Sequence, residues 1–257
     1  FHLTIAQEDY KFYGVFDGHC GTRAAKFASR ALHLNLELFL NAVAADPHLS
    51  DNEEFLKNED LGENRANIEF AVRSAFRKTQ EDFLATSGSR YRAAASRGAG
   101  RAPAAASQGV EGLAGGSKDA EAGGGGGAGG ADEDSGTTAT VALVYAHSTV
   151  VAHVGDSRAV MCCDELGGAV DVTEDHTPYS SNERERVEAS GGFIEHRGVL
   201  RVNGELAVTR TIGNRRLNQH GVLSSEPDVV SRPSFLVLAS DGLWDVVSSQ
   251  EAVDMVK

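Results

Sequence analysis

Cysteine is scarce in this 257-residue sequence, which contains only Cys20, Cys162 and Cys163. Three cysteines at this spacing provide neither a disulfide framework nor the paired thiolates of a zinc site. They suit a reducing compartment. We therefore expect an intracellular protein, cytoplasmic or nuclear, unless an organellar targeting segment lies outside this sequence.

Long apolar runs and an excess of positive charge are also missing. No run reaches the roughly 18 apolar residues of a membrane span, and no signal-peptide pattern is present, so we expect no membrane partner. The 24 Lys and Arg residues are outnumbered by 37 Asp and Glu, which gives a net charge of -13. This balance excludes a broad nucleic-acid surface and suits a cation site, although most of these carboxylates are expected simply to face solvent.

Glycine, alanine and serine dominate residues 88–134, where scattered charges are the main other feature. Such a segment buries almost no apolar surface, so we expect a low-complexity, disordered insert, with a docking or regulatory role as the alternative. The remaining residues, roughly 210, suit a single domain spanning 1–257. A monomer is expected.

Apolar periodicity predicts a mixture of helices and short strands. Strands are expected at 1–6, 10–16, 137–145, 149–154, 159–163, 192–195, 199–202, 228–230 and 235–239. Helices are expected at 22–45 and 64–85, from a Ser180–Glu183 capping box to 191–192, and from Ser249. Few helices cross between strands, so the pattern favours an antiparallel α+β arrangement.

Three apolar runs end at an aspartate beside a glycine: Asp17 with Gly18, Asp156 with Gly155, and Asp241 with Gly242. Each run places a carboxylate at a strand end, where Mg²⁺ or Mn²⁺ would find oxygen ligands. An Asp-Gly pair after an apolar run is also a strong hairpin signal, and that interpretation stays open for any one of them. Three together favour a metal-dependent hydrolase.

Two histidines invite different interpretations. His19 follows Asp17 by two residues, so it would lie near a reacting phosphate and protonate a leaving oxygen, unless it merely packs in the turn. His176 lies in a Glu-Asp-His-Thr-Pro stretch, which indicates turn and helix-entry chemistry rather than a ligand.

Five ordered motifs resemble those of the type 2C metal-dependent serine/threonine protein phosphatases. They are Phe16–Gly21, Ser135–Ala139, Val154–Ala159, Arg201–Arg210 and Ala239–Asp245. The resemblance covers nearly the whole chain outside the insert, and five motifs in order are far more specific than one glycine-rich loop.

The resemblance implies an antiparallel β-sandwich of two sheets flanked by helix pairs, with phosphoproteins as substrates. It further implies that Asp17 bridges two Mg²⁺ or Mn²⁺ ions, that the Gly18 carbonyl binds one, and that Asp241 binds the other. Asp156 would help to bind a third, looser metal, and Asp245 would support the site. By this resemblance a metal-bridging water attacks phosphorus and His19 is the general acid.

The sequence departs from the family pattern at its ends and at two internal positions. The resemblance implies a first motif with an arginine that grips the substrate phosphate and an acidic residue that binds metal. Glu8-Asp9 imitates this motif but falls in the tip of the hairpin, so we expect the real motif upstream of Phe1. We also expect another metal-binding aspartate beyond Lys257. A protein of these residues alone would be weakly active or inactive. Asn214 stands where the family usually has aspartate, and Cys20 where it has Gly or Ala. A phosphoesterase for small molecules and a catalytically impaired binding or regulatory module are the alternatives.

Overall fold

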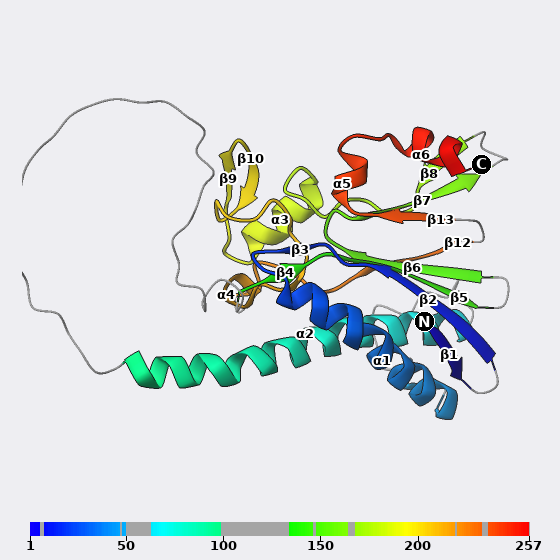
Figure 1. The fold of residues 1–257 in the computed structure, drawn as a ribbon, viewed down its shortest axis with the longest axis horizontal. Coiled ribbons are helices and arrows are strands. Elements are labelled where there is room, and N and C mark those ends of the chain that lie inside the picture. Colours follow the sequence, from blue (N-terminus) through cyan, green and yellow to red (C-terminus); the bar gives the residue numbers. More distant parts are fainter. Residues whose placement is uncertain are drawn as a thin grey trace, which may run out of the picture.

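Two antiparallel sheets, covered on their outer faces by helices, make up the body of the molecule (Figure 1). The computed structural model describes residues 1–5, 8–46, 48–49, 63–98, 134–145, 148–163, 168–218, 220–232 and 236–256. None of the helices in these ranges is long and apolar enough to cross a bilayer.

The larger sheet has five strands in the order β1-β2-β5-β6-β12. Their bounds are β1 His2–Ile5, β2 Glu8–Val15, β5 Ala139–Tyr145, β6 Ser148–Val154 and β12 Asp228–Arg232. The smaller sheet has the order β13-β7-β8, with β7 Arg158–Cys163, β8 Gly168–Asp171 and β13 Leu236–Ala239. All pairings in both sheets are antiparallel.

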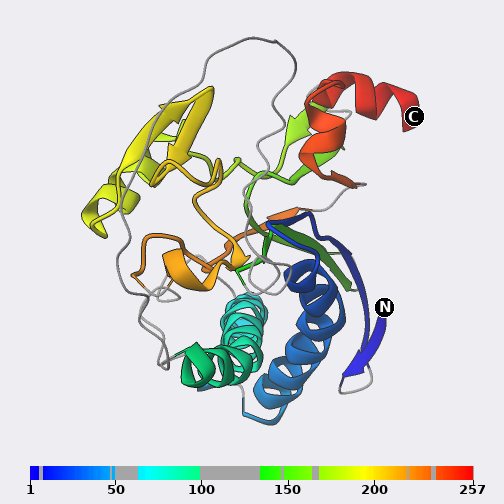
Figure 2. The same cartoon turned by 60° about the vertical axis from the view of Figure 1, so that its left-hand side comes forward.

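Helices cover the two outer faces of the sandwich. Helices α1 (Arg23–Ala45) and α2 (Glu63–Gly98) lie side by side on the larger sheet, as Figure 2 shows end-on. Helices α5 (Asp241–Trp244) and α6 (Ser249–Val256) cover the smaller sheet. The arrangement confirms the predicted α+β sandwich with helix pairs.

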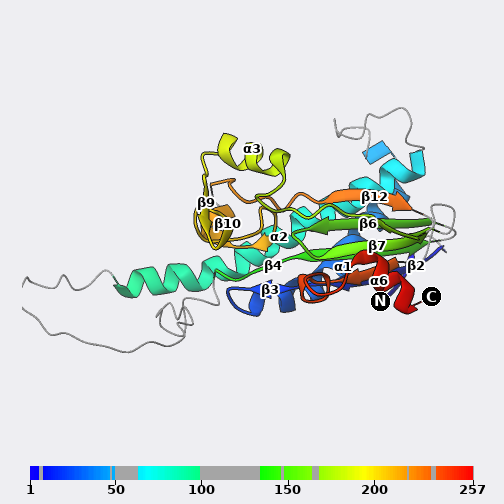
Figure 3. The same ribbon diagram turned by 90° about the horizontal axis from the view of Figure 1, so that it is seen from above.

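Short elements gather at one end of the sandwich, beside the ends of the long strands (Figure 3). They are β3 Gly18–His19, β4 Gly136–Thr137, β9 Ile194–Arg197, β10 Val199–Val202, β11 Ile212–Gly213, α3 Ser181–Ala189 and α4 Arg215–Asn218. Strands β11, β4 and β3 form one small sheet and β9–β10 a hairpin. This end carries the predicted site residues.

Both faces of the larger sheet are buried, one under the helices and the other against the smaller sheet. Because successive side chains of a strand point to opposite faces, each strand contributes to both cores. In β5, Val141 and Leu143 pack into the core under α1 and α2, whereas Ala142 packs into the core between the sheets. In β7, Met161 faces the other sheet while Val160 contacts the core under α6. The apolar runs are therefore continuous because each strand has two buried faces.

Most predicted elements are confirmed, and three details are corrected. The first hairpin is present, but Glu8 and Asp9 belong to strand β2, where Glu8 pairs with Ile5, rather than to the turn. Helix α2 continues to Gly98, beyond the predicted end at residue 85, because its last turns are rich in Ala and Arg, which favour helix. Residues 88–98 of the predicted insert are thus helical, and 99–133 lie outside the described residues.

The third correction concerns the predicted capping box at the start of α3. Ser180 is the N-cap residue, but its side chain makes no capping hydrogen bond. The carboxylate of Glu183 points away from the helix start and binds Arg210 and Thr209 instead. A charge-assisted bond to arginine is stronger than a bond to a backbone N–H, so tertiary contacts override the local motif.

Candidate metal centre

The backbone of Asp17 is held by two threonines at the end of strand β2. Its carbonyl oxygen accepts hydrogen bonds from the Thr138 N–H at 2.9 Å and the Thr137 Oγ1 at 2.9 Å. Its own N–H donates to Thr138 Oγ1 at 3.1 Å. These bonds fix the orientation of the strand end, and they give the Ser135–Ala139 motif a structural role that the sequence did not reveal.

Thr138, together with Thr140, connects Asp17 to the segment that carries Asp156. Thr138 Oγ1 lies 2.7 Å from Ser157 Oγ, and Thr140 Oγ1 donates to the Ser157 carbonyl at 2.7 Å. A side chain at Gly155, whose φ is +97°, would collide with Thr138, so this turn requires glycine. The two aspartates therefore belong to one rigid unit.

Asp17 and Asp241 come from different sheets and meet through their carboxyl groups. Burial, a hydrogen bond that the protonated Asp241 donates to Asp17, and the negative charge of Asp17 together raise the pKa of Asp241. Burial and the charges of Asp241, Asp175 and Asp17 raise the pKa of Asp156 to about 6. The three negatively charged carboxylates thus repel one another, and a bound cation would relieve this repulsion.

The donor set fits a hard divalent cation. Carboxylate oxygens from Asp17, Asp241 and Asp156 are ligands that Mg²⁺ and Mn²⁺ prefer, and Gly18 is exposed directly beside Asp17 at the start of β3. The predicted supporting residue, Asp245, lies at the C-cap of α5, where its N–H donates to the Asp241 carbonyl at 2.8 Å. Its own carboxylate is exposed, so the structure connects it to the site through the backbone.

His19 lies beside this carboxylate group and is oriented by Asn214. The His19 Nε2 is 2.7 Å from Asn214 Oδ1, which also accepts a bond from Thr211 Oγ1 at 3.0 Å. Asn214 is itself anchored by donating Nδ2 to the Asp134 carbonyl at 3.1 Å. Burial lowers the pKa of His19, although the Asn214 bond and the Asp17 and Asp134 charges oppose this effect. A lowered pKa makes the charged imidazole a stronger proton donor, and the Asp17 charge favours that charged form.

Backbone conformation explains how Asn214 reaches His19. Gly213 and Asn214 both have positive φ, +102° and +46°, a region that Gly adopts freely and Asn tolerates. A Cβ atom at Gly136 would overlap both Asn214 Oδ1 and His19 Nε2. The hydrogen bond therefore depends on a glycine at 136, a requirement that the sequence analysis did not foresee.

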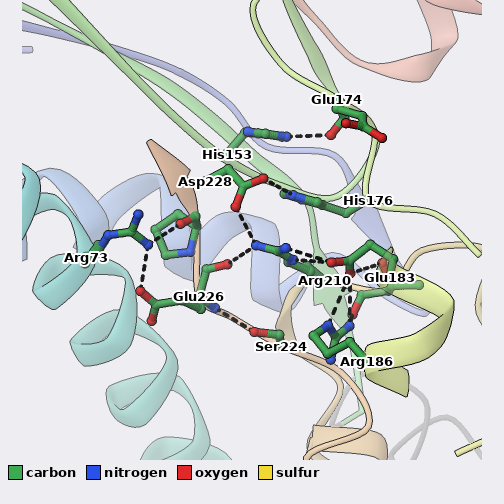
Figure 4. A network of polar contacts seen from close by, with 12 residues as sticks. Arg73, His153, Glu174, His176, Glu183, Arg186, Arg210, Ser224, Glu226 and Asp228 are labelled. Atoms are coloured by element: carbon green, nitrogen blue, oxygen red, sulfur yellow. Dashed lines mark hydrogen bonds and ion pairs between the residues drawn. The ribbon is translucent and has the colours of Figure 1, made fainter. Parts of the chain in front are cut away.

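Behind the metal centre lies a network of charged side chains, drawn in Figure 4. The Glu183 carboxylate, 5% exposed, accepts bonds from Arg210 at 2.7 Å, Arg186 at 3.0 Å and Thr209 at 2.6 Å. Arg210 also donates to Asp228 Oδ1 at 2.8 Å. Burial alone would raise the pKa of Glu183, but these bonds and the Arg210 charge lower it to about 2.

Two buried histidines join this network to the Asp156 turn. The N–H of Gly155 donates to His176 Nδ1 at 3.2 Å, so Nε2 carries the proton and donates it to Asp228 Oδ2 at 3.1 Å. His153 stacks on His176 with ring centroids 4.2 Å apart and donates its Nε2–H to the Glu174 carbonyl at 2.8 Å. Burial and neighbouring His176 lower the pKa of His153 to about 4.

His153, His176 and Asp228 place potential ligand atoms within 4.8 Å of one another. The geometry nonetheless favours a structural role. The two rings are nearly parallel, at 9°, and a metal ion lies close to the plane of each imidazole that binds it, so one ion cannot serve both. The neighbouring Arg210 guanidinium would also repel a cation. That His176 serves turn and helix-entry chemistry rather than binding a metal stays a prediction.

The fold and the acidic site define an α+β sandwich with a carboxylate-lined centre at one end of its strands. A model of the protein phosphatase 2C family matches residues 118–257. The chain is 34% identical over 248 residues to "Probable protein phosphatase 2C 59" of Arabidopsis thaliana, covering 95% of this chain and 59% of that protein. It is 51% identical over 130 residues to "Probable protein phosphatase 2C 44" of Oryza sativa subsp. japonica, covering 48% and 39%.

Solved structures show the same fold. The serine-threonine phosphatase 2C from Toxoplasma gondii superposes with a TM-score of 0.61 at 21% identity, covering 95% of this chain and 72% of that one. A C. elegans sex determining protein gives a TM-score of 0.63 at 20% identity, covering 95% and 46%. The chain belongs to the protein phosphatase 2C family. It spans about half the length of the curated relatives that it matches.

Proposed function

We propose that the whole protein is a Mg²⁺- or Mn²⁺-dependent protein serine/threonine phosphatase. Family membership supports a protein phosphatase, and the family is metal-dependent. The observation that carries the proposal is that Asp17 and Asp241, which follow strands of different sheets, lie near enough for the charge of Asp17 to raise the pKa of Asp241, with His19 beside Asp17. Phosphoproteins are the proposed substrates, and an intracellular setting is proposed because Cys20, Cys162 and Cys163 are all free thiols.

The residues of the centre have distinct proposed roles. Asp17, Gly18 and Asp241 would hold two divalent cations and Asp156 a third, looser one. Such cations supply positive charge for the phosphate oxygens and make a water molecule more acidic. His19 would protonate the leaving serine or threonine oxygen, and with Nε2–H committed to Asn214 the proton comes from Nδ1.

Metal dependence provides the first test. Full-length protein should release phosphate from a phosphothreonine peptide in the presence of Mg²⁺ or Mn²⁺ and lose this activity in excess chelator, because the opposed carboxylates need a cation. Malachite green detection of phosphate measures the effect. Full activity in chelator would contradict the proposal. Turnover of phosphorylated metabolites but not of phosphopeptides would indicate the small-molecule phosphoesterase instead.

A second candidate is a catalytically impaired binding or regulatory module, favoured by the neutral side chain of Asn214 beside His19. Calorimetry of the full-length protein separates it from an enzyme. Metal binding together with phosphate release supports the phosphatase. A protein that neither binds Mn²⁺ nor releases phosphate would be the impaired module.

The role of Gly136 is tested by Gly136→Ala. The added methyl group displaces His19 from Asn214, so turnover of a phosphothreonine peptide should fall by about one to two orders of magnitude. Turnover of p-nitrophenyl phosphate should fall less, since its leaving group needs little protonation. Gly198→Ala, a methyl group in open space at a positive φ, is the control. Equal losses of turnover on both substrates would show that His19 is not the proton donor.

A further inference from the structure

The outward face of helix α1 carries a row of apolar and basic side chains. Phe27, Leu34 and Leu38 follow one another at helical spacing, and Leu34 and Leu38 are 56% and 53% exposed. Exposed apolar side chains in isolation are ordinary, but a row along one helix face indicates an interaction surface. This helix lies on the outside of the sandwich, as Figure 2 shows.

A shallow groove of about 420 Å³ runs along this face from Thr22 to Leu34. Helix α2 supports it, because the Phe27 and Phe83 rings lie 5.5 Å apart and the Arg23 guanidinium lies 5.3 Å above the Phe83 ring. Arg23 also donates to Thr86 Oγ1 at 3.2 Å. The groove is thus preformed and does not depend on movement of α1.

The groove is positively charged, in contrast to a chain whose net charge is -13. Lys26 and Arg30 are exposed, and within the described part of the chain no acidic side chain pairs with either of them. The first turn of α1 contains no acidic residue, although the helix dipole favours acids there. Positive charge at a helix N-terminus makes this surface selective for carboxylates.

We propose that this α1 groove, which runs from Thr22 to Leu34 and is continued by the exposed Leu38, is a docking site for an acidic amphipathic helix of a partner protein. The partner's apolar face would lie against Phe27, Leu34 and Leu38, and its carboxylates would pair with Lys26 and Arg30. From residue 22 to residue 38 the helix rises about 24 Å, which is room for roughly four turns of a partner helix. Recognition of a helix in a groove uses this spacing of anchors.

A second copy of this chain fits the groove less well. In a symmetric dimer the same patch meets itself, so Lys26 and Arg30 of both copies would be brought together. Like charges brought together at an interface oppose association. The proposal does not depend on phosphatase activity, because binding alone is measured.

The test uses full-length protein and a fluorescein-labelled helical peptide with leucines along one face and glutamates flanking them. Binding is followed by fluorescence anisotropy, with a scrambled peptide of the same composition for comparison. We expect the ordered peptide to bind more tightly, and less so as salt rises. Arg30→Glu and Leu34→Ala should each weaken binding about tenfold, a loss of about 1.4 kcal/mol.

Matched controls separate the groove from general effects of charge and apolar area. Lys11→Glu, on strand β2, makes the same charge change, and Met255→Ala, 74% exposed on α6, removes a comparable apolar side chain. Both should bind like the parent. Equal binding of the scrambled peptide, no binding of either peptide, or equal losses in the controls would overturn the proposal. So would a dimer in sedimentation that Leu34→Ala dissociates, since the occupant would then be a second copy.

Discussion

Replacing Asp241 with asparagine should lower kcat/KM for phosphopeptide hydrolysis by about a thousandfold or more. The loss corresponds to about 4 kcal/mol of transition-state stabilisation, the scale on which a bound metal contributes. Asparagine keeps the shape of the side chain but removes the charge that faces Asp17. Phosphate release and Mn²⁺ calorimetry on full-length protein measure the effect. Undiminished activity would defeat the metal-ligand assignment.

The metal-free stability of the same variant distinguishes a ligand from a structural residue. Burial and Asp17 raise the pKa of Asp241, so its ionised form destabilises the folded state at neutral pH, and acidification through that pKa relieves this cost. The variant should therefore unfold at the same temperature as the parent in chelator, or higher. Metal should stabilise the parent by about 3 kcal/mol at a hundredfold excess over Kd, and the variant by less.

Asp254→Asn, an exposed position on α6, is the control for this pair of measurements. It should leave activity, metal binding and unfolding temperature unchanged. A variant at Asp241 that loses activity and also unfolds in chelator well below the parent would mean that Asp241 holds the fold together rather than binding metal.

Replacing Glu183 with glutamine should cost about 3 kcal/mol of folding free energy. The variant loses the negative charge that pairs with Arg210 and Arg186. Two partly buried guanidinium groups then lack that ion-pair partner. The unfolding temperature should fall by roughly 6 to 12 °C, measured by differential scanning fluorimetry. Glu188→Gln, an exposed position on the same helix, should change it little.

The pH dependence of stability provides an independent check on Glu183. Its pKa is lowered to about 2, so its contribution is fully present above the usual glutamate range and is lost as the pH falls from about 5 toward 2. The parent should lose about 3 kcal/mol over this interval through Glu183, and Glu183→Gln should lack that part of the decrease. Parallel pH profiles for the two proteins would contradict the assigned pKa.

The Glu183 network also has a consequence for the site. His176 exchanges two hydrogen bonds with Gly155, and its Nε2 bonds to Asp228. The His176 bond and the charge of Arg210 keep the pKa of Asp228 well below its usual range. Loosening Arg210 therefore loosens the turn that presents Asp156. Glu183→Gln should reduce activity as well as stability, although no atom of Glu183 touches the metal centre.

Where the sequence-based predictions failed, a tertiary contact prevailed over a local pattern. The Ser180–Glu183 capping box is a sound local motif, yet two arginines compete successfully for the glutamate. Helix α2 exceeded its predicted length because low apolar content was taken as loss of structure, whereas alanine and arginine favour helix without any burial.

The sequence by itself determined the order and type of the main elements and the strand-end positions of Asp17, Asp156 and Asp241, because alternation of apolar residues is a local property. It also identified His19 and the unusual Asn214. Only the tertiary structure decided that the carboxyl groups of Asp17 and Asp241 lie together, that Asn214 orients His19 across 195 residues of chain, and that Glu183 forms an ion pair with Arg210. These are pairings between distant segments, set by how sheets and helices pack rather than by any neighbouring residue.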